Sequence, residues 1–170
     1  AMFGQVATDN SQIVIASFAA LERVVRESAG QNKQTILVDT SAGLSPHEIA
    51  KVRVASLLLV PVSSSSVELN AARKFISSLQ ENNYPVPILI VPNKINDNSD
   101  LLKIISVFRA LPCMLASPIP YDRRIEKLLA DQHFPGELAN LREAAFPLIR
   151  SINKAIKSPY LPDSKLRQID

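Results

Sequence analysis

An acidic residue stands directly after an apolar run within Thr35–Leu44. The run over residues 35–38 predicts a strand buried on both faces, and Asp39 ends it. A carboxylate at the carboxyl end of such a strand can hold a magnesium-bound water or orient an attacking water. Gly43 lets the backbone turn sharply, so that an N–H group can approach a terminal phosphate. The alternative is that Asp39 only caps the loop that follows it.

A second candidate site follows another apolar run, at Asn93-Lys94. The segment invites comparison with N-K-x-D, the signature that binds guanine in GTPases. Its acidic residue, Asp97, stands one place late and is out of register with the amino and imino groups of guanine. We therefore expect adenine rather than guanine. The alternative is a strand-end asparagine that satisfies only its local backbone.

Other kinds of chemistry find little support. His47 and His133 lie far apart, with no acidic or cysteine pattern at metal-ligand spacing, and are expected on the surface. The single cysteine, Cys113, excludes an internal disulfide and is expected to be a small buried residue. No G-x-S-x-G elbow is present. Four scattered glycines exclude both G-x-x-x-x-G-K-[ST] and G-x-G-x-x-G within these 170 residues.

The elements that must position these residues alternate along the chain. Continuous apolar runs predict buried parallel strands, and helical spacing of apolar residues lies between them. Asp97 or Ser99 is expected to cap one helix, and Pro147 is expected to start a new helix or kink the last one. The alternation predicts an α/β domain with a doubly wound, mostly parallel sheet. The expected strands are residues 13–16, 35–38, 57–62, 88–91 and 114–119.

Length and composition place these elements in one domain. We expect a single α/β domain over residues 1–157 and an irregular tail over residues 158–170. An apolar fraction of 46% with 21% charged residues predicts a sizeable core. The apolar runs are too short to span a bilayer and residues 1–21 lack a basic signal-peptide region, so we expect a cytoplasmic protein without membrane contact.

Basic residues gather in the last third of the chain. Arg150, Lys154 and Lys157 share one helix face by their spacing. A net charge of +3 permits contact with nucleic acid without requiring it. The alternative is an ordinary solvated helix face.

The order of these segments resembles the ParA/MinD family of deviant-Walker ATPases. The matching stretches are ILVDTSAGL, ASLLLVPVSSSS, the loop and helix expected over Ser63–Leu79, PILIVPNKIN and SPIPYDRRIEKLL, within about Gln12 to Ile156. The second departs from the usual family pattern at Ser56, where an aspartate is usual. Five weak motifs in the right order carry the resemblance.

The resemblance implies a P-loop NTPase type of sheet, incomplete at the N-terminus, with ATP and magnesium as ligands. Asp39 would lie near magnesium and Gly43 near the γ-phosphate, while Asn93, Lys94 and Pro120 would contact adenine. It also implies an ATP-bound homodimer that binds DNA nonspecifically through the late basic residues, with a partition-complex or cargo protein as partner. The implied role is plasmid or chromosome partitioning, or cargo positioning.

One part of the family pattern is missing, because no K-G-G-x-G-K-[ST] loop precedes Asp39. We expect a trimmed sequence or a truncated gene. Without the backbone N–H groups and lysines of that loop, we expect this chain alone to hydrolyse little or no ATP. The alternative function is a nucleotide-independent interaction or scaffold module of the same fold, and nucleotide binding distinguishes the two.

Overall fold

The computed structural model describes residues 23, 26–27, 36–40, 55–131, 139–158 and 166–168. The chain divides into two units, Ala1–Val54 and Ala55–Asp170. In the first unit Arg23, Arg26 and Glu27 are helical and exposed, with 3.8 Å between Arg23 Nε and Glu27 Oε1.

The expectation of a buried strand before Asp39 is wrong for the residues described. Residues 36–40 lie in no helix or strand, and all five are exposed; Leu37 is 83% exposed. An apolar run forms a strand only when its N–H and C=O groups make hydrogen bonds with a neighbouring strand. The sequence of the run does not show whether such a neighbour is present.

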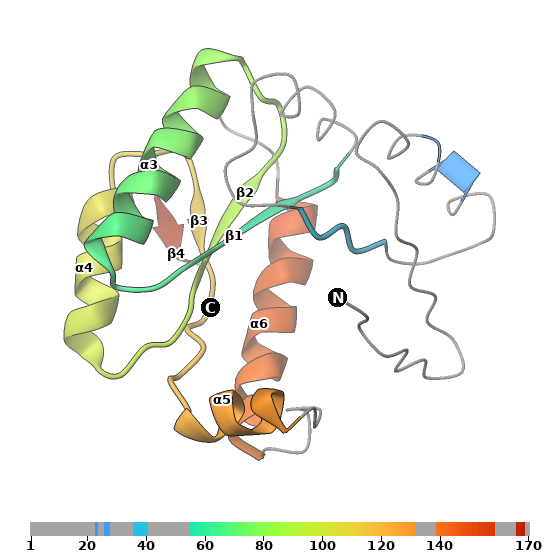
Figure 1. Ribbon diagram of the computed structural model, residues 1–170. Helices are drawn as coiled ribbons and strands as arrows, with labels where there is room; N and C mark the ends of the chain where they lie inside the picture. The colour runs from blue at the N-terminus through green and yellow to red at the C-terminus, as the bar shows by residue number, and fades with distance from the viewer. Residues whose placement is uncertain are drawn as a thin grey trace. The chain divides into compact units, whose positions relative to one another are not determined.

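A parallel sheet forms the centre of the second unit (Figure 1). Its strands are β1 (Leu58–Val62), β2 (Ile88–Pro92), β3 (Met114–Leu115) and β4 (Arg167–Gln168), in that spatial order. The α/β class with parallel strands is thus confirmed. Two strands match the expected runs closely, and β3 is shorter than its run. In the segment expected to be an irregular tail, β4 pairs with β3 through its backbone.

Helices cover both faces of this sheet. Figure 1 shows α3 and α4 side by side on one face and α6 on the other. The helices are α3 (Ser66–Glu81), α4 (Asn98–Phe108), α5 (Arg123–Ala130) and α6 (Ala139–Lys157). None of the helices in the described part of the chain has both the length and the apolar character of a membrane span.

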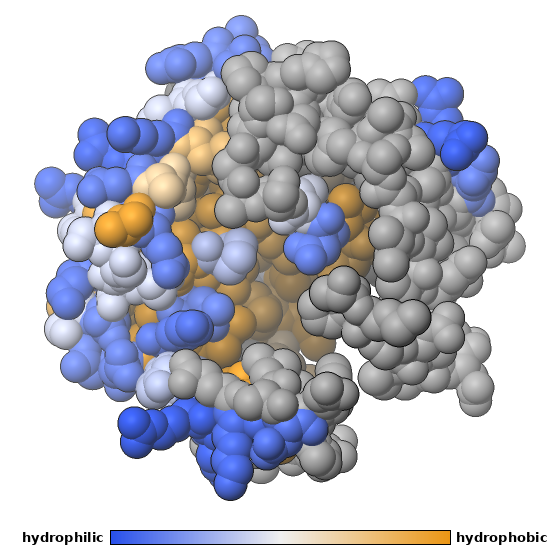
Figure 2. Space-filling view, in the orientation of Figure 1, coloured by the Kyte–Doolittle hydropathy of each residue, from blue (hydrophilic) through white to orange (hydrophobic). Residues whose placement is uncertain are grey.

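Strand β2 is buried along its whole length, which explains its continuous apolar run. Successive side chains of a strand point to opposite faces. Leu89 and Val91 pack with Ala155 of α6, and Ile88 and Ile90 therefore face the α3 and α4 layer. In Figure 2 hydrophilic residues lie over α5 and the outer side of α4, with apolar residues between them.

Helix α6 continues through a proline. Pro147 lies inside it, so the expectation that Pro147 starts a new helix is wrong. An internal proline costs about 3 kcal/mol, because it cannot donate to the carbonyl four residues earlier. Leu148 and Ile152 pack on the sheet and offset this cost. The buried hydroxyl of Ser151 accepts the Ser117 N–H at 3.2 Å and donates to the Pro147 carbonyl at 3.1 Å.

Cys113 precedes β3 and is buried, which confirms the expectation from the sequence. Burial raises the pKa of its thiol to about 12. The thiol therefore stays protonated at neutral pH and acts as a small apolar side chain.

Candidate functional site

Three loops meet where the strands of the sheet end. We define this carboxyl edge as residues 63–66, 93–97 and 117–122. In a parallel sheet the carboxyl ends lie on one side, where ligands bind in open α/β folds. The Asn93 N–H donates to the Val62 carbonyl at 2.7 Å, and the Ile119 N–H donates to the Pro92 carbonyl at 2.8 Å. The three loops are therefore neighbours in space.

The two segments expected to contact adenine adjoin each other at this edge. Ile95 and Pro120 form a parallel bridge. The Ile95 N–H donates to the carbonyl before Pro120 at 3.1 Å, and the Tyr121 N–H donates to the Ile95 carbonyl at 2.9 Å. Asn93, Lys94 and Pro120 are thus brought together from two separate parts of the sequence.

Lys94 has a left-handed backbone, with φ of 57°. This conformation costs about 1–2 kcal/mol for a residue with a Cβ atom. Its N–H donates to Oδ1 of Asn93 at 2.9 Å, while the Lys94 side chain is exposed. No described residue accepts from Nδ2 of Asn93, so this amide can donate two hydrogen bonds to a ligand.

The serine loop after β1 is held by an acidic residue of α3. Glu68 Oε2 accepts the Ser63 N–H at 2.9 Å, and Ser63 Oγ accepts the Ser65 N–H at 3.2 Å. The bonds from the Ser63 backbone and hydroxyl, with the charge of Lys94, lower the pKa of Glu68. The pattern Ser65-Ser66-Val67-Glu68 has the form of a capping box, in which Glu68 would accept the N–H of Ser65. In the structure Glu68 instead accepts the N–H of Ser63, two residues earlier.

Asp100 connects two of the three loops. Its carboxylate accepts the Asn96 N–H at 3.0 Å and the Asn96 Nδ2 at 2.9 Å. The bond from the Ser64 hydroxyl, followed by the two from Asn96, lowers its pKa to about 2. The residue is 7% exposed, and Lys103 Nζ lies 3.8 Å from its Oδ1. The position of Asp100 in the sequence gives no sign of this role.

The Asp100 network should make the protein sensitive to acid. An aspartate has a pKa near 3.9 in the unfolded chain, and about 2 here. A lowered pKa contributes stability above the unfolded value, and this contribution is lost as the pH falls from about 4 to about 2. Urea denaturation of the wild type and of Asp100→Asn should therefore show a stability difference that shrinks over this range. A stability difference that stays constant from about pH 4 to about pH 2 contradicts the prediction. Ser64→Ala removes one of the hydrogen bonds that lower the pKa of Asp100, so this variant should lose the Asp100 contribution at higher pH than the wild type.

Asp97 is the N-cap of α4, as the sequence predicts. Its carboxylate accepts hydrogen bonds from the Ser99 N–H at 2.7 Å, the Ser99 hydroxyl at 2.7 Å and the Asp100 N–H at 3.1 Å. The pKa of Asp97 is lowered, first by the Ser99 hydroxyl. Because this carboxylate already accepts three hydrogen bonds at the start of α4, the structure supports the expectation that it does not contact guanine.

Neither of the two residues expected near the phosphates belongs to the described part of the second unit. Asp39 belongs to the first unit, where it is exposed and in no strand. Gly43, His47 and His133 lie outside the described residues. The roles of Asp39 and Gly43 therefore stay predictions.

Three cations of α6 form a separate feature, which we call the basic face. Arg150, Lys154 and Lys157 are all exposed, in agreement with their helical spacing. No described acidic side chain forms an ion pair with them. The exposed apolar residues Phe146 and Ile149 lie on the same helix.

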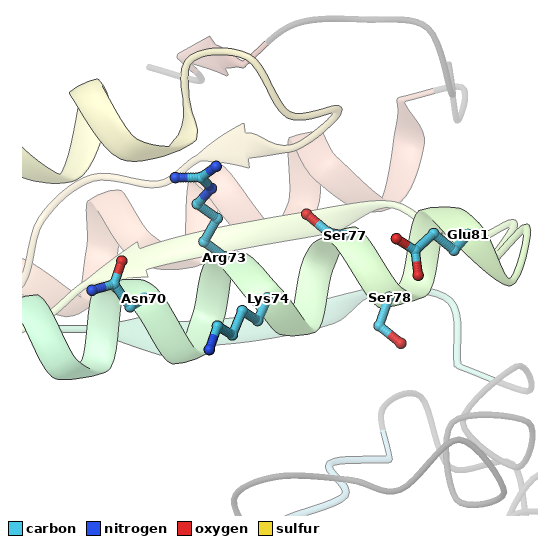
Figure 3. A pocket seen from close by; sticks show the side chains of 6 residues that line it. All are labelled: Asn70, Arg73, Lys74, Ser77, Ser78 and Glu81. Atoms are coloured by element: carbon cyan, nitrogen blue, oxygen red, sulfur yellow. The ribbon is translucent and has the colours of Figure 1, made fainter.

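A groove beside α3 was not expected from the sequence. The described residues that line it are all polar and all belong to α3: Asn70, Arg73, Lys74, Ser77, Ser78 and Glu81. In Figure 3 the side chains of Arg73 and Lys74 point to different sides of the helix. These residues do not converge on one point, and they contain no nucleophile activated by a neighbouring base.

Comparison with known proteins gives no family for this chain. No family model matches it, and no curated protein matches it.

Proposed function

We propose that the carboxyl edge is part of an adenine-nucleotide site of the ParA/MinD type, in a chain that acts in partitioning or cargo positioning. The observation that carries this proposal is the bridge between Ile95 and Pro120, which joins the Asn93-Lys94 segment to the I-P-Y-D segment. The resemblance implies that these two segments together contact the base.

The polar groups at this edge favour a base that accepts hydrogen bonds. The amide of Asn93 offers donors for the ring nitrogens of adenine. The carboxylates that would pair with guanine are already engaged, because Asp97 caps α4 and Asp100 binds Asn96 and Ser64. Adenine therefore suits the site better than guanine.

We expect binding without efficient hydrolysis. The 170 residues contain no glycine-rich phosphate loop, and the N–H groups of such a loop supply much of the charge stabilisation in phosphoryl transfer. Magnesium would supply further charge neutralisation at the phosphates, with Asp39 as its proposed partner through water. No three described His, Cys, Asp or Glu side chains form a metal-binding group, but a magnesium ion bound through water and phosphates needs only one or two protein carboxylates.

Calorimetric titration of the chain with ADP and ATP tests the site. Asn93→Ala should weaken binding by about 2–13-fold, the effect of one lost hydrogen bond of about 0.5–1.5 kcal/mol. The matched control is Asn153→Ala, which removes an exposed asparagine of α6 and should leave the affinity unchanged. The absence of any adenine-nucleotide binding by the wild type would instead favour the scaffold function.

The basic face supports a second activity, nonspecific DNA binding. Three exposed cations within two turns of one helix are a suitable arrangement for contacts with successive phosphates. The resemblance implies that such binding belongs to an ATP-bound homodimer. A DNA-bound dimer and a partition-complex or cargo protein as its partner are parts of this proposal.

A further inference from the structure

Helix α6 carries a second set of exposed side chains beside its basic face. Three of them are large and apolar: Phe146 is 68% exposed, Ile149 is 51% exposed and Ile156 is 49% exposed. They follow one another at intervals of three and seven positions in one continuous helix (Figure 1), so they lie along one side of it. We call these three residues the apolar stripe. The proposed adenine site and the proposed DNA contact do not use them.

The apolar stripe is distinct from the side of α6 that packs on the sheet. That side is formed by Leu148, Ile152 and Ala155, which belong to the core around β2 and β3. Successive residues of a helix are about 100° apart around its axis. By this rule the stripe falls between the side packed on the sheet and the basic face. Single exposed apolar residues are ordinary on a protein surface, whereas three along one line of a helix form a patch that suits a partner.

Positive charge adjoins the stripe. Phe146 and Arg150 are four positions apart and are therefore neighbours on the helix surface. Among the exposed side chains that the structure describes on α6, one is acidic, Glu143, against the three cations of the basic face. The outer surface of α6 therefore combines a row of apolar groups with a net positive charge.

We propose that this outer surface docks an amphipathic helix of a partner protein, in which acidic side chains stand beside a row of apolar ones. A helix presents its anchors every three to four residues, which matches the direction and spacing of the stripe. DNA would neutralise the cations but leave the stripe in water. A second copy of this chain would bring two surfaces of net positive charge together. An acidic, amphipathic helix satisfies both halves of the surface.

This inference goes beyond the proposed adenine site and does not depend on it. It shares Arg150, Lys154 and Lys157 with the proposed DNA contact. The partner helix and a DNA duplex should therefore compete for α6.

A synthetic peptide is the probe. It has about three heptads with leucine at the a and d positions and glutamate at the e and g positions, so that like charges keep it from pairing with itself. The control peptide has lysine in place of glutamate. In fluorescence anisotropy at about 50 mM salt and without nucleotide, the wild type should bind the glutamate peptide at least about tenfold more tightly than the lysine peptide. An unlabelled DNA duplex should displace the glutamate peptide.

Two double variants locate the contact. Ile149→Ala with Ile156→Ala should weaken binding of the glutamate peptide at least about tenfold, because the apolar contact is lost. The same variant should keep its affinity for DNA, which needs the cations only. Arg150→Glu with Lys157→Glu should reverse the preference, so that the lysine peptide binds more tightly than the glutamate peptide.

The matched control shortens exposed apolar side chains elsewhere. Val67→Ala with Leu102→Ala changes residues of α3 and α4 that are 79% and 64% exposed, and should leave peptide binding unchanged. A circular dichroism melt of each variant shows that it is folded.

Three results would overturn the proposal. Unchanged binding of the glutamate peptide by the Ile149→Ala, Ile156→Ala variant would show that binding follows charge without the stripe. No binding of the glutamate peptide by the wild type at about 1 mM would exclude a helix of this chemistry. Binding to vesicles of phosphatidylserine and phosphatidylcholine that requires the stripe, in place of peptide binding, would assign the surface to a membrane. Because the assays contain no nucleotide, none of these results bears on the adenine site.

Discussion

Replacing Phe108 with alanine should lower the free energy of unfolding by about 3–5 kcal/mol. Phe108 ends α4 and is fully buried beneath the sheet face that carries α3 and α4. Removing its ring takes away transfer free energy and leaves a cavity, because a close-packed core collapses only partly into the space. Urea denaturation followed by circular dichroism measures the loss.

The same helix offers a matched control. Leu102 also lies in α4 but is 64% exposed, so Leu102→Ala should change stability by no more than about 0.5 kcal/mol. Should Phe108→Ala not fold at all, Ile104→Val gives a milder test, since Ile104 is fully buried and the change should cost about 0.5–1.5 kcal/mol. Equal effects of Phe108→Ala and Leu102→Ala would contradict the packing described here.

Removing the basic face should nearly abolish DNA binding if this face contacts the phosphates. Each neutralised phosphate contributes about 0.9 to the slope of log K against log salt. A triple variant with alanine at Arg150, Lys154 and Lys157 should therefore have a slope about 2.7 smaller in magnitude than the wild type. Fluorescence anisotropy with a labelled duplex, at several salt concentrations between about 50 and about 200 mM, measures both affinity and slope.

A second triple variant controls for net charge. Arg73, Lys74 and Arg109 are exposed cations of the second unit outside α6, and their replacement by alanine removes the same charge. This variant should keep most of the affinity and most of the slope. If both triple variants lose affinity equally, binding follows the total charge and the basic face has no special role.

The central strands and the helices between them could be predicted from local patterns. The run at 88–91 is continuously apolar because β2 is buried on both faces, and its helical neighbours show apolar residues at helical spacing. The N-cap at Asp97 was predictable because an aspartate before a helix can accept the first free N–H groups. These features depend on short stretches of chain.

Features that depend on distant partners could not be predicted. Residues 36–38 have the composition of a buried strand but lie in none, whereas Arg167–Gln168 have no apolar run and pair with β3. Backbone pairing of an edge strand leaves little mark on its side chains. Pro147 is tolerated because α6 packs on the sheet, which the proline itself does not reveal.

The candidate site shows the same division. The neighbourhood of Asn93 and Pro120 follows from two strand ends at one edge of a parallel sheet, and the order of motifs anticipated it. The hydrogen bonds that Asp100 accepts from Asn96 and Ser64 depend on how α4 approaches the serine loop, and the spacing of these residues in the sequence does not predict them. The left-handed backbone of Lys94 is likewise imposed by its surroundings, because a lysine alone does not favour it.

The order of the strands has a consequence for how the protein folds. Paired residues Leu59 and Leu89 are 30 positions apart and Leu89 and Met114 are 25 apart, whereas Met114 and Arg167 are 53 apart. Closing a longer loop costs more entropy, so β1, β2 and β3 can assemble before β4 joins them. With only two residues in its ladder, β4 is also the strand expected to detach first in the native state. In a hydrogen-exchange experiment, the amide hydrogens in the ladder between β3 and β4 should then exchange with solvent earlier than those of β2, which lies between two strands.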